Sequence, residues 1–195
     1  MLTKRALLVI DVQQGLCDGA TPPFELDEVI ARINAVAAKA RVAGAPVIFI
    51  QHEGTSGYLE HGTPGWQLHR AVRVEPSDLK LRKSATDSFH RTELQALLEQ
   101  HGVTELVVCG LHTEFCVDTT VRRALALGYP VVLVADAHTS EGSAVLSPAL
   151  VIAHHNDVLS NISSFGPRVR PLPAADVEFT LTYRAAVEAT PPPTT

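Results

Sequence analysis

The sequence is poor in cysteine and in long apolar runs, and each shortage excludes a class of protein. Its three cysteines, Cys17, Cys109 and Cys116, are an odd number at spacings that match neither a zinc motif nor a disulfide framework. We therefore expect a reducing, cytoplasmic setting. The first apolar run, Ala6–Ile10, is cut off by Asp11 and is too short for an export signal, and no later run is long enough to span a bilayer, so no membrane partner is expected.

An excess of basic charge is also lacking. The formal net charge is -5 and the two signs are scattered along the 195 residues, which argues against a nucleic-acid partner. Hydrophobic residues make up 46% of the chain, enough for one sizeable core. We expect a single domain over residues 1–187, followed by a tail rich in proline and threonine at 188–195.

Apolar runs alternate with amphipathic stretches along most of the chain. The predicted strands are Ala6–Ile10, Pro46–Ile50, Leu79–Arg82, Leu106–Cys109 and Pro130–Ala135. The predicted helices are Asp27–Ala43, Thr92–His101, Thr113–Leu127 and Ser143–Asn161. This order indicates an α/β fold with three αβα layers and a mostly parallel, doubly wound sheet of about five or six strands. The strand Leu79–Arg82 has one polar face, which places it at a sheet edge.

Three chemically complementary residues follow predicted strands. Asp11 ends the first strand, Lys83 ends the third, and Cys116 lies on the turn after the fourth, where a helix begins. Parallel sheets bind ligands at the carboxyl ends of their strands, so we expect these side chains to converge. A thiol needs a base and an ammonium can steady the ionised pair. The backbone N–H groups of His112 and Cys116 would supply an oxyanion hole, and the helix start is expected to lower the pKa of the thiol.

Each of these residues also has a purely structural interpretation. Cys116 could be a buried cysteine that packs a helix start, and Lys83 a solvated charge on an edge strand. Asp11 could cap the chain after its strand, although a carboxylate that closes an apolar strand needs partners. For Cys17 and Cys109 packing is the favoured role.

A long stretch from His52 to Val74 is rich in glycine and histidine and has weak periodicity, which favours a lid or a pocket wall. His52, His61 and His69 could form a metal site, because imidazoles are common ligands. Their irregular spacing and the lack of an accompanying aspartate favour solvated or substrate-facing histidines, so no metal is expected. Trp66 is a core plug or a pocket wall. The substrate-binding candidates are His52, Trp66, Phe89 and Phe115.

Several separated motifs together carry a resemblance to a known family. They are Leu7–Gln13, Arg82-Lys83 with Asp87–Phe89 and Thr92–Leu94, Gly110–Val117 with Thr120 and Ala124, and Val134–Ala137. In this order, from about Ala6 to Asn156, they resemble the isochorismatase-like cysteine hydrolase superfamily. The resemblance implies a Rossmann-like topology, a catalytic triad of Asp11, Lys83 and Cys116, a cis peptide between Leu111 and His112, and a homo-oligomer.

The resemblance also narrows the chemistry. Members named isochorismatases lack the cysteine and cleave a vinyl ether, whereas members with all three residues mostly hydrolyse C–N bonds, as nicotinamidases and N-carbamoylsarcosine amidohydrolases do. Cys116 favours this amidase branch. Nicotinamidases carry an Asp-x-His metal motif after the second strand, but the sequence here reads Gln51-His52-Glu53. This difference argues against nicotinamide as the substrate and against a bound zinc-type ion.

The expected function is therefore that of a cysteine hydrolase. It would cleave the C–N bond of a small amide or carbamoyl compound through a thioester intermediate, without a cofactor. The alternatives are a vinyl ether hydrolase and a non-catalytic binding or assembly protein on the same fold. A redox-active thiol protein is a further alternative, disfavoured because no resolving cysteine forms a Cys-x-x-Cys pair with Cys116. The sequence does not identify the amide.

Overall fold

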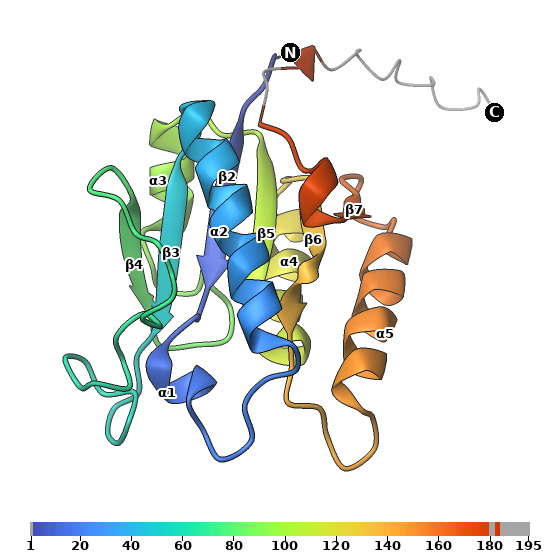
Figure 1. Cartoon of the computed structure of the whole chain (residues 1–195). Coiled ribbons are helices and arrows are strands. Elements are labelled where there is room, and N and C mark those ends of the chain that lie inside the picture. Colours follow the sequence, from blue (N-terminus) through green and yellow to red (C-terminus); the bar gives the residue numbers. More distant parts are fainter. Residues whose placement is uncertain (1, 180–181, 184–195) are drawn as a thin grey trace.

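A computed structural model describes residues 2–179 and 182–183 of the chain (Figure 1). Its centre is a six-stranded sheet of parallel strands in the order β4-β3-β2-β5-β6-β7. These strands are β2 (Arg5–Ile10), β3 (Val47–His52), β4 (Leu79–Lys83), β5 (Glu105–Leu111), β6 (Val131–Thr139) and β7 (Val169–Leu172). A short antiparallel pair, β1 (Leu2–Thr3) with β8 (Thr182–Tyr183), lies outside the sheet. The predicted tail at 188–195 falls outside the described residues.

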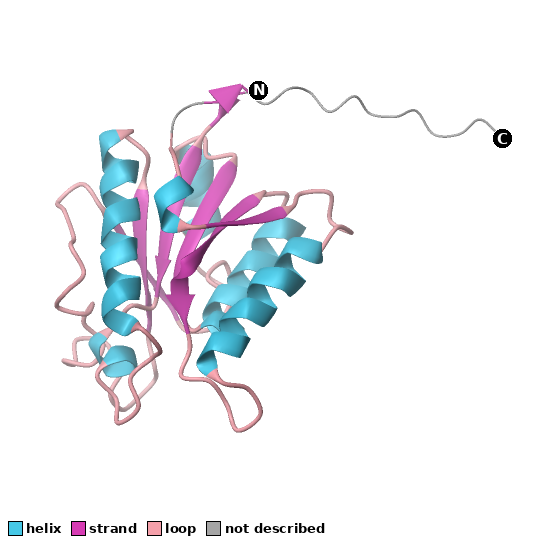
Figure 2. Ribbon diagram, turned by 45° about the vertical axis from the view of Figure 1, so that its right-hand side comes forward, coloured by secondary structure: helices cyan, strands magenta, loops and turns pink. Residues whose placement is uncertain are grey.

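Helices cover both faces of the sheet and complete the expected three layers (Figure 2). On one face α2 packs its buried side chains into a core shared with β2 and β6, while α3, α4 and α5 pack into the core on the opposite face. These helices are α2 (Leu26–Val42), α3 (Leu94–Gln100), α4 (Asp118–Ala126) and α5 (Pro148–Asn161). Three shorter elements are α1 (Gln14–Cys17), the single π-helical turn η1 (Thr113–Val117) and the 3₁₀ turn η2 (Ala174–Asp176). No helix in the described ranges combines the length and hydropathy needed to cross a bilayer.

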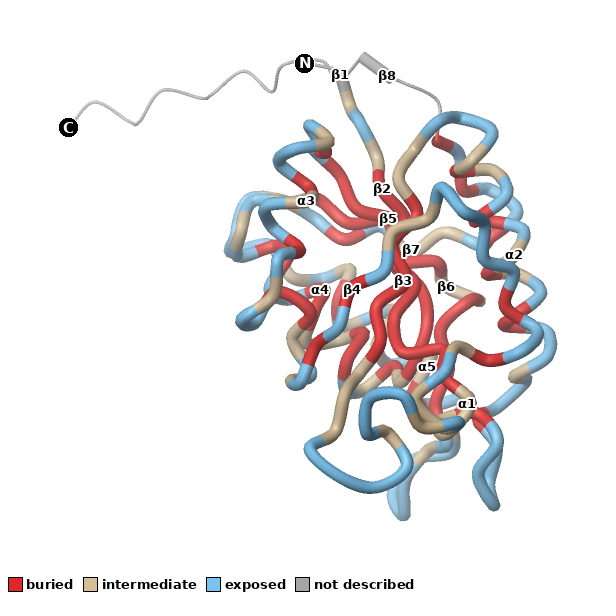
Figure 3. Tube along the Cα trace, turned by 90° about the vertical axis from the view of Figure 1, so that its left-hand side faces the viewer, coloured by how far each residue is buried: buried red, intermediate tan, exposed pale blue. Residues whose placement is uncertain are grey.

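The central strands are mostly apolar, which suits the burial of both of their faces (Figure 3). In β2, Leu7 and Val9 enter the core under α2, whereas Leu8 and Ile10 enter the core on the other side, and all four are fully buried. The strand β4 alternates exposed and buried residues and forms one edge of the sheet, as its sequence predicts. The carboxyl ends of β2, β3, β4 and β5 therefore lie at a common rim.

Several elements differ from the sequence-based expectation: the short elements α1, β1 and β8 were not predicted, and two larger differences concern β7 and α5. The edge strand β7 was not predicted, because Arg170 and Pro171 interrupt its apolar pattern; proline is tolerated at an edge where no ladder bond is lost. The helix expected from Ser143 begins instead at Pro148, whose fixed φ angle and missing N–H suit the first helical position.

Glycine at position 110 allows the close approach of β5 to β2. Gly110 has φ 119°, and a Cβ atom there would lie 2.1 Å from the carbonyl oxygen of Ile10. Only glycine fits a backbone contact of this kind. The contact lies one residue before Asp11 on one strand and six before Cys116 on the other, so it draws the two segments of the candidate site together.

Candidate active site

The structure brings together the three side chains that the sequence singles out. The ammonium Nζ of Lys83 donates to Oδ2 of Asp11 at 2.7 Å and lies 3.2 Å from Sγ of Cys116. The side chains of Lys83 and Asp11 are 0% and 1% exposed, and Cys116 is buried. The rim of the sheet therefore holds a buried ion pair in contact with a thiol. The catalytic roles of these residues stay a prediction.

Asp11 has an unusual backbone conformation that directs the chain into the site. Its φ angle is 53°, in the left-handed region that aspartate enters more readily than most residues. Its N–H donates to the carbonyl of Ile50 at 2.8 Å, and its carbonyl accepts from Gln13 N at 2.8 Å. These bonds extend the contact between β2 and β3 by one residue and fix the carboxylate beside Lys83.

Lys83 is surrounded by acceptors. Besides the carboxylate and the thiol, Nζ lies 3.0 Å from the carbonyl of Ala85 and 3.1 Å from Nδ1 of His52. An ammonium has three N–H bonds, so four acceptors compete for them. The pKa of His52 is lowered by burial and by the Lys83 charge, which favours a neutral ring with Nδ1 as the acceptor. His52 thus belongs to the centre itself as a partner of Lys83, a contact that sequence reasoning missed.

The thiol of Cys116 is protonated at rest, so the expectation of a lowered pKa is wrong. Burial and, to a smaller extent, the charge of Asp11 raise the pKa of Cys116 to about 12, although the charge of Lys83 acts in the opposite direction. The favourable field of a helix start is too small to offset removal from water. The pKa of Cys17 is raised to about 12 as well, so thiol acidity does not distinguish Cys116. What distinguishes Cys116 from Cys17 is the contact of its sulfur with the ammonium of Lys83.

The turn that carries Cys116 is held by its own backbone. The peptide bond between Leu111 and His112 is cis. The carbonyl of His112 accepts from Phe115 N at 3.1 Å and from Val117 N at 3.2 Å as η1 begins. The π-helical turn then continues into α4, which fixes the direction of the thiol. An oxyanion hole at the N–H groups of His112 and Cys116 stays a prediction.

The long loop after β3 is fastened over this rim by two buried amides. Gln13, which is fully buried, donates from Nε2 to the carbonyls of His52 and Trp66, both at 2.9 Å, and accepts from His52 N at 2.7 Å. Gln51 also donates to the Trp66 carbonyl at 2.9 Å. The loop is therefore tied at Trp66 to the segments that follow β2 and end β3, and its role as a pocket wall stays a prediction. The sequence offered one signal for this attachment: a glutamine follows each of two apolar strands, Gln51 directly and Gln13 after two intervening residues.

The remaining candidates lie in different surroundings. The ring of His61 contacts the Trp66 indole edge-on at 4.6 Å, and His69 Nε2 lies 3.3 Å from Asp18. Phe89 packs in the core with its ring 6.3 Å from Tyr129, and Phe115 is 57% exposed. Their substrate contacts stay a prediction.

The segment that matches the nicotinamidase metal motif does not fit a resident ion. The amide of Gln51 is used by the loop, and Glu53 lies 3.4 Å from the guanidinium of Arg82. Of the three residues, only His52 faces the site.

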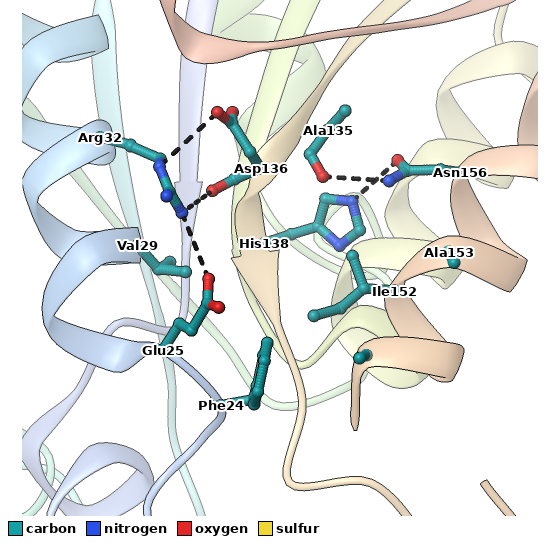
Figure 4. A pocket seen from close by; sticks show the side chains of 11 residues that line it. Phe24, Glu25, Val29, Arg32, Ala135, Asp136, His138, Ile152, Ala153 and Asn156 are labelled. Atoms are coloured by element: carbon teal, nitrogen blue, oxygen red, sulfur yellow. Dashed lines mark hydrogen bonds and ion pairs between the residues drawn. The ribbon is translucent and has the colours of Figure 1, made fainter. Parts of the chain in front are cut away.

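A second buried polar group lies farther along the rim, beside a cavity of about 300 Å³ between α2, β6 and α5 (Figure 4). His138 is 1% exposed; its Nδ1 lies 2.8 Å from Oγ1 of Thr113 and its Nε2 lies 3.0 Å from Oδ1 of Asn156. Asn156 in turn donates to the carbonyl of Ala135 at 3.0 Å. Burial lowers the pKa of His138 to about 4, so the ring is neutral. Nδ1 then accepts from Thr113 and Nε2–H donates to Asn156. Sequence reasoning missed this cluster, because its residues lie in separate elements.

The sequence matches the Isochorismatase domain over residues 5–146. It is 45% identical over 137 residues to a streptothricin hydrolase of Streptomyces noursei, a match that covers 70% of this chain and 50% of the relative. It is 30% identical over 199 residues to ureidoacrylate amidohydrolase RutB of Methylobacterium radiotolerans, covering 82% of this chain and 73% of the relative.

A solved structure of an isochorismatase family protein superposes with a TM-score of 0.79 at 34% identity, covering 86% of this chain and 97% of that one. The chain spans about half the length of the streptothricin hydrolase that it matches. The domain match covers the rim residues Asp11, Lys83 and Cys116. This chain belongs to the isochorismatase family.

Proposed function

We propose that this protein is a cysteine hydrolase that cleaves the C–N bond of a small amide or carbamoyl compound through a thioester. The contact of a buried thiol with a Lys–Asp ion pair is the observation that carries the proposal. The names of two relatives, a streptothricin hydrolase and a ureidoacrylate amidohydrolase, support hydrolysis and an amide substrate.

The first step is a proton transfer coupled to attack. Because the pKa of Cys116 is high, the thiol keeps its proton until the substrate carbonyl is in place. Asp11 then takes that proton while Sγ bonds to the carbonyl carbon and the carbonyl π electrons move to oxygen. The N–H groups of His112 and Cys116 would receive this oxyanion.

The second step breaks the C–N bond. The oxyanion re-forms the carbonyl, the protonated Asp11 gives its proton to the leaving nitrogen, and the amine departs, which leaves a thioester on Cys116. Asp11 is once more a carboxylate beside Lys83.

Water completes the cycle by the same route. Asp11 accepts a proton from water as its oxygen attacks the thioester carbon, and the S–C bond breaks on collapse of the intermediate. The departing sulfur takes the proton back from Asp11. Lys83 keeps Asp11 ionised between steps and steadies each transient thiolate.

A panel of primary amides, ureas and carbamoyl compounds, assayed for ammonia release, tests the proposal. We expect turnover of at least one class, loss of that turnover in Cys116→Ala, and a mass increase on Cys116 alone when the reaction is quenched early. Turnover at the wild-type rate in Cys116→Ala would exclude the thioester. Failure of every compound in the panel would favour a non-catalytic protein on this fold.

A further inference from the structure

The catalytic centre contains the donor set of a soft metal site. A carboxylate oxygen of Asp11, a ring nitrogen of His52 and Sγ of Cys116 all lie within 4.8 Å of one another. Asp11 is 1% exposed, and its Oδ1 has no hydrogen-bond partner among the described residues. The ion pair with Lys83 uses Oδ2, and the only other donor facing the carboxylate among the described residues is the thiol of Cys116, a weak donor that hydrogen-bonds to the Asp11 side chain. A buried acceptor without a partner is costly and indicates a place for a further cation or donor.

The Lys83 ammonium already lies among these donors. Its Nζ is 2.7 Å from Asp11 Oδ2, 3.1 Å from His52 Nδ1 and 3.2 Å from Cys116 Sγ. The three groups therefore converge on a positive charge. Oxygen, imidazole nitrogen and thiolate sulfur are together the ligands that zinc-type ions prefer.

We propose that this centre also binds a thiophilic divalent cation, with Asp11, His52 and Cys116 as ligands, in exchange for the ammonium of Lys83. On binding, the Cys116 thiol loses its proton to solvent, the sulfur bonds to the metal, and the ammonium is displaced from the three donors. Coordination makes the sulfur a weaker nucleophile and occupies the Asp11 carboxylate that would accept its proton, so the bound form should be inactive. The site takes His52 from the segment that matches the Asp-x-His motif, and its other two ligands, Asp11 and Cys116, come from outside that segment.

The ammonium sets the affinity, because it competes for the same donors and repels a second cation. Its removal should therefore strengthen metal binding. A merely structural lysine would have the opposite effect, since loss of the buried ion pair loosens the centre. Lys83→Met, which keeps the length of the side chain without its charge, separates the two cases.

Cobalt(II) reports sulfur ligation directly by a charge-transfer band in the near ultraviolet, and it requires no turnover. We expect Lys83→Met to bind Co²⁺ at least tenfold more tightly than the wild type, with the sulfur band present. Lys83→Met/Cys116→Ser should lose the band, and Lys83→Met/His52→Asn should bind at least tenfold more weakly than Lys83→Met. The matched control is Lys83→Met/His61→Asn, which removes a histidine outside the donor set and should bind like Lys83→Met.

A second measurement uses the wild-type protein, in case Lys83→Met does not fold. Zn²⁺ should slow alkylation of Cys116 by iodoacetamide, a chelator should restore it, and Mg²⁺ should have no effect. In His52→Asn the protecting Zn²⁺ concentration should rise at least tenfold, and in His61→Asn it should not change. A folded Lys83→Met without a sulfur band, or protection that is equal in His52→Asn and the wild type, would overturn the proposal. Failure of the amide panel would leave these spectral results unaffected, so the two proposals can fail separately.

Discussion

Two buried polar clusters occupy the rim of the same sheet, and they differ in charge. Around β2 and β4 the cluster is ionic, with the Asp11–Lys83 pair at 2.7 Å and almost no exposed surface. Near the ends of β5 and β6 the cluster is neutral, because burial holds His138 unprotonated between Thr113 and Asn156. Both attach to the turn that carries Cys116, the first through its sulfur and the second through Thr113.

The difference shows how one fold supports two kinds of buried polarity. A buried ion pair gains little net stability, because desolvation of the two charges offsets their attraction. It suits a centre that must move protons. A neutral, fully hydrogen-bonded chain fixes geometry without any buried charge. Such a neutral cluster is suited to hold the turn that carries Cys116 in place.

Removal of one charge from the ionic cluster should have the largest effect. Asp11→Asn leaves the Lys83 ammonium buried without a counter-charge, and we expect a loss of about 3–5 kcal/mol in the free energy of unfolding. Urea denaturation measures it. In the double variant Asp11→Asn/Lys83→Met part of the stability should return, because no uncompensated charge remains. A double variant less stable than Asp11→Asn would mean that the ammonium is not the source of the cost.

The ionic cluster was the part of the site open to prediction from the sequence. Asp11 and Lys83 stand at the carboxyl ends of predicted strands and Cys116 lies on the turn after a third, and parallel strands bring those ends to one rim. The strands before Asp11 and Cys116 are recognisable because they are buried on both faces, and the strand that ends in Lys83 is recognisable by its alternation of apolar and polar residues. The edge strand β7 lacks that signal, since Pro171 and Arg170 break its apolar run.

The neutral cluster and the state of the thiol could not be predicted in the same way. Thr113, His138 and Asn156 come from η1, β6 and α5, and their contact depends on how α5 packs on the sheet. A local rule gave the wrong direction for the pKa of Cys116, because a helix start is visible in a sequence but the depth of burial is not.

The neutral cluster should make stability depend on acid. The pKa of His138 falls from 6.5 to about 4 on folding, so the unfolded state binds the proton first as the pH drops. Above pH 6.5 the ring is neutral in both states, so the free energy of unfolding is at its full value. Between pH 6.5 and 4 the free energy of unfolding falls by about 3 kcal/mol in total. Urea midpoints from pH 8 to 4 measure it. His138→Phe should show a shallower loss over that window, and an identical slope in both proteins would contradict the assignment.

A smaller effect is expected where the neutral cluster meets the turn that carries Cys116. Thr113→Val keeps the shape of the side chain but removes the hydroxyl that donates to His138, and it should cost about 1–3 kcal/mol. Thr113→Ser retains the hydroxyl and is the matched control. If the cluster positions the turn, kcat on an accepted amide should fall in Thr113→Val while KM stays within twofold, and Thr113→Ser should restore kcat. Equal kcat in all three proteins would limit Thr113 to a structural role.

The smallest effect is expected at an ion pair that is not buried. Arg122 donates to both oxygens of Asp118, one turn earlier on α4, at 3.0 and 2.8 Å, and 44% of its side chain is exposed. Its geometry is as good as that of Asp11–Lys83, but water reaches the Arg122 guanidinium whether or not it pairs, and the Asp118 side chain keeps 16% of its surface exposed, so Arg122→Ala should change the free energy of unfolding by about 0.5 kcal/mol or less. Urea denaturation of Arg122→Ala and of Asp11→Asn under the same conditions compares the two losses directly. A loss in Arg122→Ala as large as that in Asp11→Asn would show that the cost comes from breaking an ion pair anywhere, and would remove burial as the distinction between the rim and the surface.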